Sequence, residues 1–132
     1  MALTMAFTFP DHFRFADSHE YANPEGDMVR IGISEFAVDQ LGDIVFVDLP
    51  EKGTQLMRGK SFGSVESVKA VEDMYSPIGG EVIERNEEVI NNPEELQNDP
   101  HGKGWLMLLR PNEASQLEEL MDSSTYSNKV NS

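Results

Sequence analysis

The sequence predicts a mainly β domain with short flanking helices and a helix near its C-terminal end. Apolar and polar residues alternate over short runs separated by glycine, proline or aspartate, which is typical of short strands joined by turns. These runs never alternate with long helical patterns, so a parallel α/β sheet is not expected. A length of 132 residues fits one domain over residues 1–132. We expect its ordered core at about residues 12–122, between short frayed termini.

The first half of the chain predicts two strands on either side of a short helix. Residues 27–33 carry apolar side chains at alternate positions, which is the period of a half-buried strand. Ser34 can cap a helix that Gly42 ends, because a serine hydroxyl accepts from a free helix N–H and glycine permits the left-handed turn. Residues 44–48 then form a strand and residues 49–53 a turn.

The middle of the chain predicts a β hairpin. Residues 62–67 and 70–75 are two extended runs on either side of residues 68–69. A turn that contains proline and two glycines closes the second run before a further strand over residues 81–85. The tip of the hairpin therefore lies close to Lys69.

The last third of the chain predicts a helical turn, a strand and a helix. Pro93 at a first helical position favours a short helical turn. Residues 105–109 form an apolar strand in which Trp105 is expected to belong to the core. Asn112 can cap a C-terminal helix, and residues after Ser123 are expected to fray. Three apolar side chains would share one face of this helix: Leu117, Leu120 and Met121.

Composition excludes several classes of function. The net charge is -14 and the isoelectric point is about 4.4, so we expect no binding to nucleic acid or to an anionic membrane, and partners should present basic patches. There is no cysteine, so redox chemistry requires an imported group. His12, His19 and His101 form no pair with metal-ligand spacing, so we expect surface histidines and no metal site.

The chain shows no sign of a membrane or secretory segment. No apolar run approaches the ~18 residues that a membrane helix requires. The opening MALTMAFTFP is short and lacks the basic start of a signal peptide. We therefore expect a cytoplasmic bacterial protein, with a mitochondrial-matrix protein already trimmed of its transit segment as the alternative.

Residues 62–82, FGSVESVKAVEDMYSPIGGEV, resemble the glycine cleavage H-protein family. The similarity is strongest over residues 66–70 and extends from about His12 to Met121. It implies a flattened β barrel or sandwich of the hammerhead type found in lipoyl and biotinyl carriers, with lipoate in amide linkage to Lys69. A tight turn also suits this role physically, because it presents the lysine amine to a modifying enzyme without unfolding the backbone.

The resemblance also implies roles for side chains near the lysine. Glu66 would be recognised by the lipoate-attaching enzyme. A groove that receives the loaded arm would be lined by Ser18, Glu20, Gln40 and Asp73. Gln40 stands where some relatives have histidine, and Tyr21 stands where tryptophan often follows the glutamate, so the polar details of this groove differ from the family pattern.

By resemblance the chain is a carrier with no catalytic activity of its own. Its lipoyl group would take an aminomethyl group from the pyridoxal-phosphate glycine decarboxylase (P protein) and pass it to the folate-dependent aminomethyltransferase (T protein). It would also deliver electrons to dihydrolipoyl dehydrogenase (L protein). We expect a monomer. An acidic collar of Glu66, Glu72 and Asp73 suits docking to basic partner surfaces, and tethering makes each delivery effectively intramolecular.

Other interpretations of the lysine hairpin stay open. A lipoyl domain of a 2-oxoacid dehydrogenase usually has aspartate before the lysine and a flexible linker after the domain, whereas Val68 precedes Lys69 here and no Pro/Ala linker follows. A biotin carrier typically has methionine on both sides of the lysine. A lipoate relay that resembles the H protein, or an unmodified β interaction module, requires experiment to separate from a glycine cleavage carrier.

Overall fold

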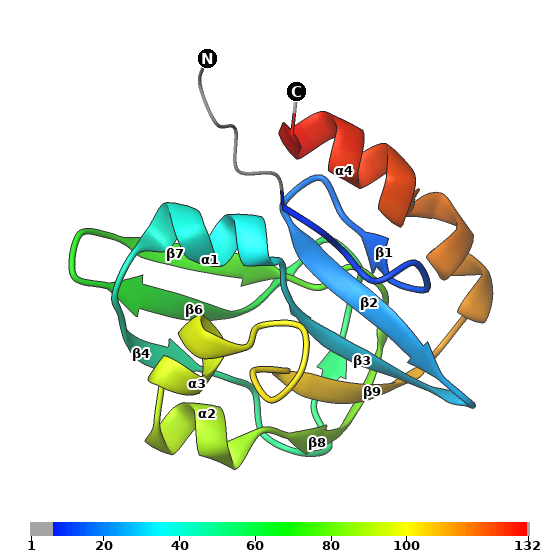
Figure 1. Cartoon of the computed structure of the whole chain (residues 1–132). Helices are drawn as coiled ribbons and strands as arrows, with labels where there is room; N and C mark the ends of the chain where they lie inside the picture. Colours follow the sequence, from blue (N-terminus) through cyan, green and yellow to red (C-terminus); the bar gives the residue numbers. More distant parts are fainter. Residues whose placement is uncertain (1–6, 132) are drawn as a thin grey trace.

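The computed structural model describes residues 7–131 and contains two antiparallel sheets with short helices along their edges (Figure 1). The larger sheet has the order β10 (Met121–Asp122), β1 (Arg14–Phe15), β2 (Glu20–Glu25), β3 (Met28–Ile33), β9 (Met107–Pro111), β8 (Gly80–Arg85) and β5 (Gln55–Leu56). The smaller sheet has the order β4 (Ile44–Asp48), β6 (Ser61–Ser67) and β7 (Val71–Tyr75). The helices are α1 (Glu35–Leu41), α2 (Glu87–Asn91), α3 (Glu94–Asn98), the 3-10 helix η1 (Ala114–Glu119) and α4 (Ser123–Asn131).

A common apolar core joins the two sheets. Ile31 and Leu109 from the larger sheet and Val65 from the smaller one all belong to it and are almost fully buried. The predicted mainly β fold is confirmed, and so is the hairpin, which β6 and β7 form. The predicted cap of α1 is also present, since the Ser34 hydroxyl accepts from the Ala37 N–H at 3.1 Å.

Two elements of the second half differ from the prediction. The strand expected at residue 105 begins at Met107, and the Trp105 ring is only partly buried, with the Arg30 guanidinium 4.4 Å from its centroid. The structure also contains α2, which the sequence pattern did not predict. Asn86 caps this helix by accepting from the Glu88 N–H at 3.2 Å.

The predicted C-terminal helix is present as α4, but it does not lie over the apolar residues 117–121. That segment is a short 3-10 helix followed by β10, in which Met121 pairs with Phe15 of β1. Residues 123–131, where the sequence predicts fraying, form the helix α4, and the Asp122 carboxylate accepts from the Thr125 N–H at 2.8 Å at the start of this helix. Of the N-terminal end expected to fray before residue 12, Phe9 packs edge-on against Phe15 and Tyr126, while residues 1–6 and residue 132 lie outside the described residues.

Helix α4 is held by an aromatic cluster on the outer side of β1 and β2. The Tyr126 ring stacks on Phe15 with 4.2 Å between centroids, and Phe13 stacks on Tyr21. These four side chains are almost inaccessible to solvent, so they tie the C-terminal helix to the start of the chain. No helix within residues 7–131 is both long and apolar enough to cross a membrane.

Candidate functional site

Lys69 lies at the exposed tip of the β6–β7 hairpin, as the sequence predicts. Ser67 fixes the turn around it. The Ser67 N–H donates to the Ala70 carbonyl at 2.8 Å, and the Ser67 hydroxyl accepts from the N–H groups of Lys69 and Ala70 at 3.3 and 3.2 Å. The lysine side chain is therefore carried by a rigid backbone. Sequence reasoning missed Ser67, although serine before a short turn is a known signal for such bonds.

A second set of hydrogen bonds fastens the hairpin tip to the rest of the fold. The Val68 N–H donates to the Asp43 carbonyl at 3.0 Å. The Gln97 side chain of α3 in turn donates to the Asp43 carboxylate at 3.2 Å and accepts from the Ile44 N–H at 3.1 Å. Helix α3 thus fixes the position of the lysine through the segment that enters β4.

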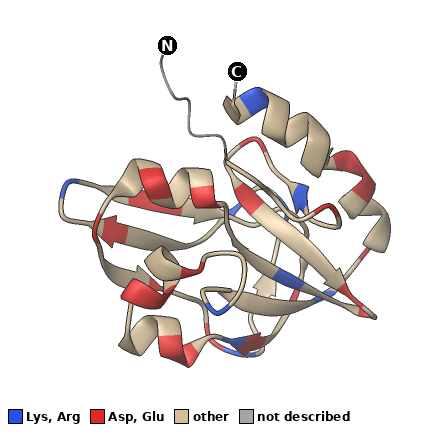
Figure 2. Cartoon of the chain, viewed as in Figure 1, with Lys and Arg blue, Asp and Glu red and all other residues tan. Residues whose placement is uncertain are grey.

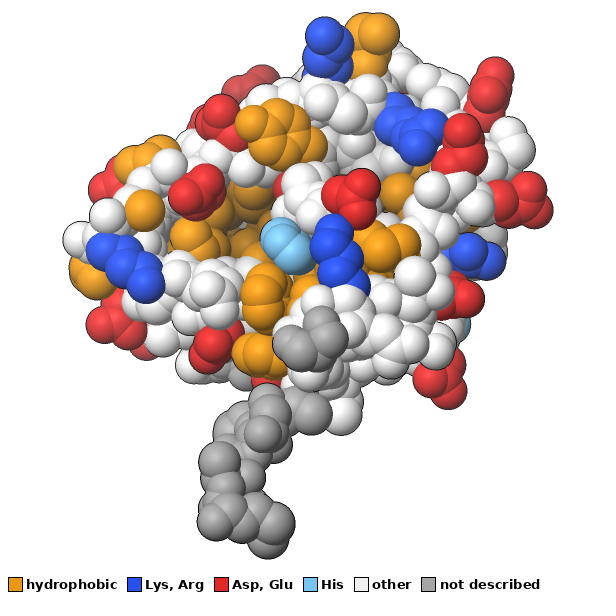
Figure 3. Space-filling view, turned by 90° about the horizontal axis from the view of Figure 1, so that it is seen from above, with side chains coloured by type: hydrophobic (Ala, Val, Ile, Leu, Met, Phe, Trp, Pro, Cys, Tyr) orange, Lys and Arg blue, Asp and Glu red, His pale blue; other side chains and the backbone are white. Residues whose placement is uncertain are grey.

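A groove of about 510 Å³ opens beside the lysine, between α1 and the hairpin. It is lined by Ser18, His19, Glu20, Ile33, Phe36, Ala37, Gln40, Leu41, Val65, Lys69, Ala70, Glu72, Asp73 and Met74. Figure 3 shows the hollow, with hydrophobic side chains at its floor and acidic side chains around it. All four residues that the resemblance assigns to a groove are thus brought together with Lys69 in one depression.

Glu20 closes the end of the groove away from the lysine. Its side chain is 2% exposed, and its two oxygens accept from the Ser18 hydroxyl and, at 2.9 Å, from the Tyr75 N–H. Burial raises the pKa of Glu20, and the two hydrogen bonds oppose that effect. The carboxylate therefore links β2 of the larger sheet to β7 of the smaller sheet, in addition to lining the cavity.

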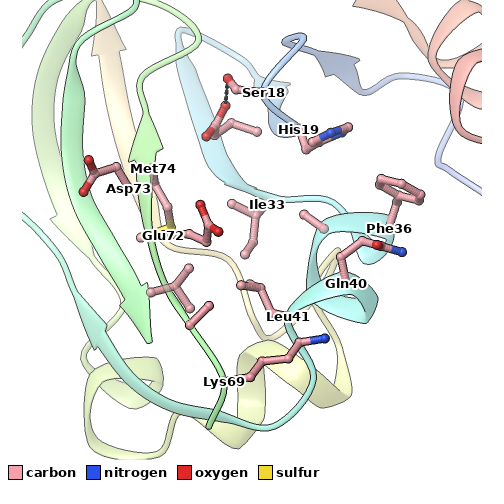
Figure 4. A pocket seen from close by; sticks show the side chains of 14 residues that line it. Ser18, His19, Ile33, Phe36, Gln40, Leu41, Lys69, Glu72, Asp73 and Met74 are labelled. Atoms are coloured by element: carbon pink, nitrogen blue, oxygen red, sulfur yellow. Dashed lines mark hydrogen bonds between the residues drawn. The ribbon is translucent and has the colours of Figure 1, made fainter. Parts of the chain in front are cut away.

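The acidic residues after the lysine divide between two faces of the hairpin. Glu72 and the buried Met74 lie on one face of β7, and Figure 4 shows the Glu72 carboxylate turned into the groove. Asp73 also borders the groove, but its carboxylate points to the other side of the strand. The alternation of side chains along a strand explains the difference, and it makes Glu72 the carboxylate nearer the interior of the groove.

His19 forms the wall of the groove opposite the hairpin, where it is partly exposed and makes contacts that the prediction of a surface histidine did not include. Its backbone has a φ of 82°, and its Nδ1 shares a hydrogen bond of 2.7 Å with the Tyr126 hydroxyl. That hydroxyl also bonds the Ser34 hydroxyl at 2.7 Å, which caps α1. Burial lowers the pKa of His19. One phenol oxygen therefore connects α4 to two pieces of the groove wall.

Glu66 lies on the other face of the hairpin from the groove. It is exposed on β6 and is paired in register with Phe46 of β4 and Val71 of β7. Its neighbour Val65 points inward and lines the groove. Within residues 7–131, no group of three or more histidine, aspartate or glutamate side chains is arranged to hold a metal ion.

Comparisons with known proteins agree on one family. The family model described as glycine cleavage H-protein matches residues 13–132. The chain is 71% identical over 126 residues to a glycine cleavage system H protein of Prochlorococcus marinus (strain NATL2A), covering 96% of this chain and 98% of that protein. For the protein of the same name in Parasynechococcus marenigrum the identity is 71% over 127 residues, with 96% and 98% covered.

A solved structure is similar as well. The crystal structure of a glycine cleavage system H protein from Mycobacterium marinum superposes with a TM-score of 0.84 at 36% sequence identity. The superposition covers 92% of this chain and 98% of that chain. Sequence and fold similarity therefore both extend over nearly the whole length of the chain.

Proposed function

Because the chain belongs to the glycine cleavage H-protein family, we propose that it is a lipoyl carrier whose cofactor is joined to Lys69 by an amide bond. The observation that carries this proposal is the position of Lys69, which is exposed at the tip of a hydrogen-bonded turn and borders a groove. A modifying enzyme can reach such an amine, and a rigid turn defines where the attached arm begins.

The residues around Lys69 fit a lipoyl group. Among residues 7–131, no hydrogen bond or ion pair holds the lysine ammonium, so its acylation breaks no polar interaction of the fold. The groove offers apolar side chains for a hydrocarbon arm, namely Ile33, Leu41, Val65 and Met74. Attachment of the arm would therefore let it leave water without displacing a packed side chain.

When attached, the lipoyl group supplies a disulfide that can take up an aminomethyl group and a pair of electrons. We propose the partners that the family implies: glycine decarboxylase, aminomethyltransferase, dihydrolipoyl dehydrogenase and the lipoate-attaching enzyme. The chain itself contributes a fixed attachment point and a sheltered groove, and it catalyses no step. We also propose that it acts as a monomer in the bacterial cytoplasm.

The groove is suited to a cationic amine at the end of the arm. Glu72 and Glu20 would attract it by charge, and the Ser18 hydroxyl and the Gln40 amide could bond to it. This attraction must stay at a few kcal/mol, because the transferase has to remove the arm. Shelter from water would slow loss of the aminomethyl group as ammonia and formaldehyde.

The test is to express the chain in cells that lipoylate proteins, and to map the modification by peptide mass spectrometry. We expect one lipoyl amide, at Lys69. Lys69→Arg is the matched control, since it keeps the charge and the fold but cannot be acylated. Modification at Lys60 or Lys103, or none, would refute the assignment. A chain lipoylated on Lys69 but inactive in reconstituted glycine cleavage would instead be a lipoate relay.

A further inference from the structure

Within residues 7–131, the large exposed apolar side chains are concentrated on one sheet. Six large hydrophobic side chains are exposed among the described residues, and five of them belong to β4, β7 or the hairpin turn: Val45, Phe46, Val68, Val71 and Tyr75. The sixth, Met57, follows β5 of the other sheet. Single exposed hydrophobic side chains are normal on a protein surface. A cluster of them on a chain of net charge -14 indicates an interaction site.

A β bulge creates part of this cluster. Ile44 pairs with Ser67 and Phe46 pairs with Glu66, so Val45 is an extra residue in β4 with no partner on β6. As a result, Val45 and Phe46 are both about half exposed, at 49% and 53%, whereas Ile44 is buried at 6%. A regular strand would have turned one of the two inward. Bulges are frequent beside functional sites because they redirect side chains in this way.

The strand register makes the exposed residues one continuous surface. Phe46, Glu66 and Val71 are neighbours across the three strands, and Val68 follows at the tip beside Lys69. We call Val45, Phe46, Glu66, Val68 and Val71 the hairpin face. The next row on the same side of the sheet is acidic at both ends, with Asp48, Ser64 and Asp73 in register. Figure 2 shows acidic colour on these strands and a basic tip on the hairpin.

The hairpin face is separate from the groove. Successive side chains of a strand point to opposite sides, so Val65 and Met74 line the groove while Glu66 and Val71 face outward. Val68 and Val71 are 70% and 63% exposed, so no part of the described chain covers them. The face borders Lys69 on the side away from the groove.

We propose that the hairpin face is the docking surface for the enzyme that acylates Lys69, and that this enzyme receives Phe46 in an apolar depression flanked by lysine or arginine side chains. The inference rests on the proposed function. That enzyme meets the chain before any arm exists, so it must bind the protein itself close to the lysine amine.

In the reaction, the Lys69 nitrogen attacks the acyl carbon of lipoyl adenylate, AMP leaves with the electron pair of the broken C–O bond, and the ammonium gives up two protons.

Charge decides against a second copy of this chain as the occupant. Two hairpin faces brought together would oppose Glu66, Asp48 and Asp73 to the same carboxylates, in a protein of net charge -14. A partner with basic side chains around an apolar pocket would complement both the apolar side chains and the carboxylates of the hairpin face. Exposed aromatic side chains that enter such pockets commonly dominate the binding energy of an interface.

The test is the steady-state kinetics of lipoylation with the purified attaching enzyme, lipoate and ATP, using the apo-protein as the varied substrate. Phe46→Ala should raise KM for the protein about tenfold with kcat unchanged. Truncation of an aromatic side chain that anchors an interface commonly weakens binding by a factor of about ten or more. Val71→Ala should raise KM by a smaller factor. Met57→Ala is the matched control, because Met57 is 67% exposed but lies away from the hairpin face, and its KM should equal that of the wild type.

Thermal unfolding of each variant checks that the fold is intact, and Phe46 and Val71 test the face from two different strands. Equal KM values for all three variants and the wild type would overturn the proposal. So would a wild-type dimer in sedimentation that Phe46→Ala converts to a monomer, because the occupant would then be a second copy. If wild-type protein is not acylated at Lys69 at all, the proposed function fails, whatever the variants do.

Discussion

His101 should make the unfolding free energy of this protein depend on pH between about 6.5 and 4. Its Nε2 accepts from the Glu35 N–H at 3.0 Å, at the first turn of α1, so the ring must be unprotonated at that nitrogen. The imidazole also packs edge-on against Phe13 and Tyr21. Burial lowers the pKa of His101 from 6.5 to about 4, and nearby Asp99 opposes the effect. His101 is therefore a half-buried side chain with a hydrogen-bond partner, whereas a surface histidine is expected from the sequence.

The size of this pH effect follows from the difference between the pKa of His101 in the folded and in the unfolded protein. A pKa that is lower by about 2.5 in the folded protein corresponds to at most about 3–4 kcal/mol of unfolding free energy. The ring is partly exposed, and solvent screening reduces the value to about 2 kcal/mol. Between pH 6.5 and 4 the unfolded chain binds a proton that the folded chain does not. This contribution is thus complete above pH 6.5 and is lost as the pH falls toward 4.

Urea unfolding at pH 7, 6, 5 and 4.5 measures the effect when wild type is compared with His101→Gln. Glutamine offers an oxygen to the Glu35 N–H and does not titrate. Subtracting the variant's unfolding free energy from that of wild type at each pH therefore cancels the effects of the other carboxylates and of the overall charge. We expect the stability of wild type relative to the variant to fall by about 2 kcal/mol from pH 7 to 4.5. Parallel curves, or an NMR titration midpoint of His101 near 6.5, would refute the reasoning.

Three further predictions concern the hairpin and the groove. Ser67→Ala should lower the unfolding free energy by about 1–2 kcal/mol and speed amide exchange at Lys69, since two N–H groups lose their acceptor; unchanged exchange would contradict this role. Glu66→Ala should slow lipoylation while leaving thermal stability unchanged, because an exposed carboxylate contributes little to the fold. When the protein carries the aminomethyl group and the enzymes have been removed, Glu20→Gln should release formaldehyde faster than wild type. Equal rates would mean that Glu20 links the two sheets and does not protect the aminomethyl group.

The hairpin and α1 could be predicted because their signals are local. Ser34, the alternation over residues 27–33 and the turn at Lys69 each act within a few residues of chain. The position of the lysine followed directly. The groove residues could be predicted only through the family resemblance, since Ser18, Gln40 and Asp73 lie in three separate segments that no local pattern brings together.

What could not be predicted depends on contacts between distant parts of the chain. Strands β1 and β10 have two residues each, so they show no period, and their pairing of Phe15 with Met121 joins the two ends of the chain. Helix α4 owes its place to Tyr126, whose ring stacks on Phe15. The bulge at Val45 could not be predicted either, because the sequence alone does not show whether a valine in a strand is exposed or buried.

The register of the hairpin determines both surfaces of the carrier at once. A slip of β6 by one residue would turn Glu66 into the groove in place of Val65, and a slip of β7 would turn Val71 inward in place of Met74. Neither surface could then serve the lysine. The hydrogen bonds of Ser67 and the bond from Val68 to Asp43 fix the register at the tip itself. We therefore expect single changes of groove-lining polar side chains to alter arm docking by degrees, whereas changes that shift the hairpin register should abolish docking and acylation together.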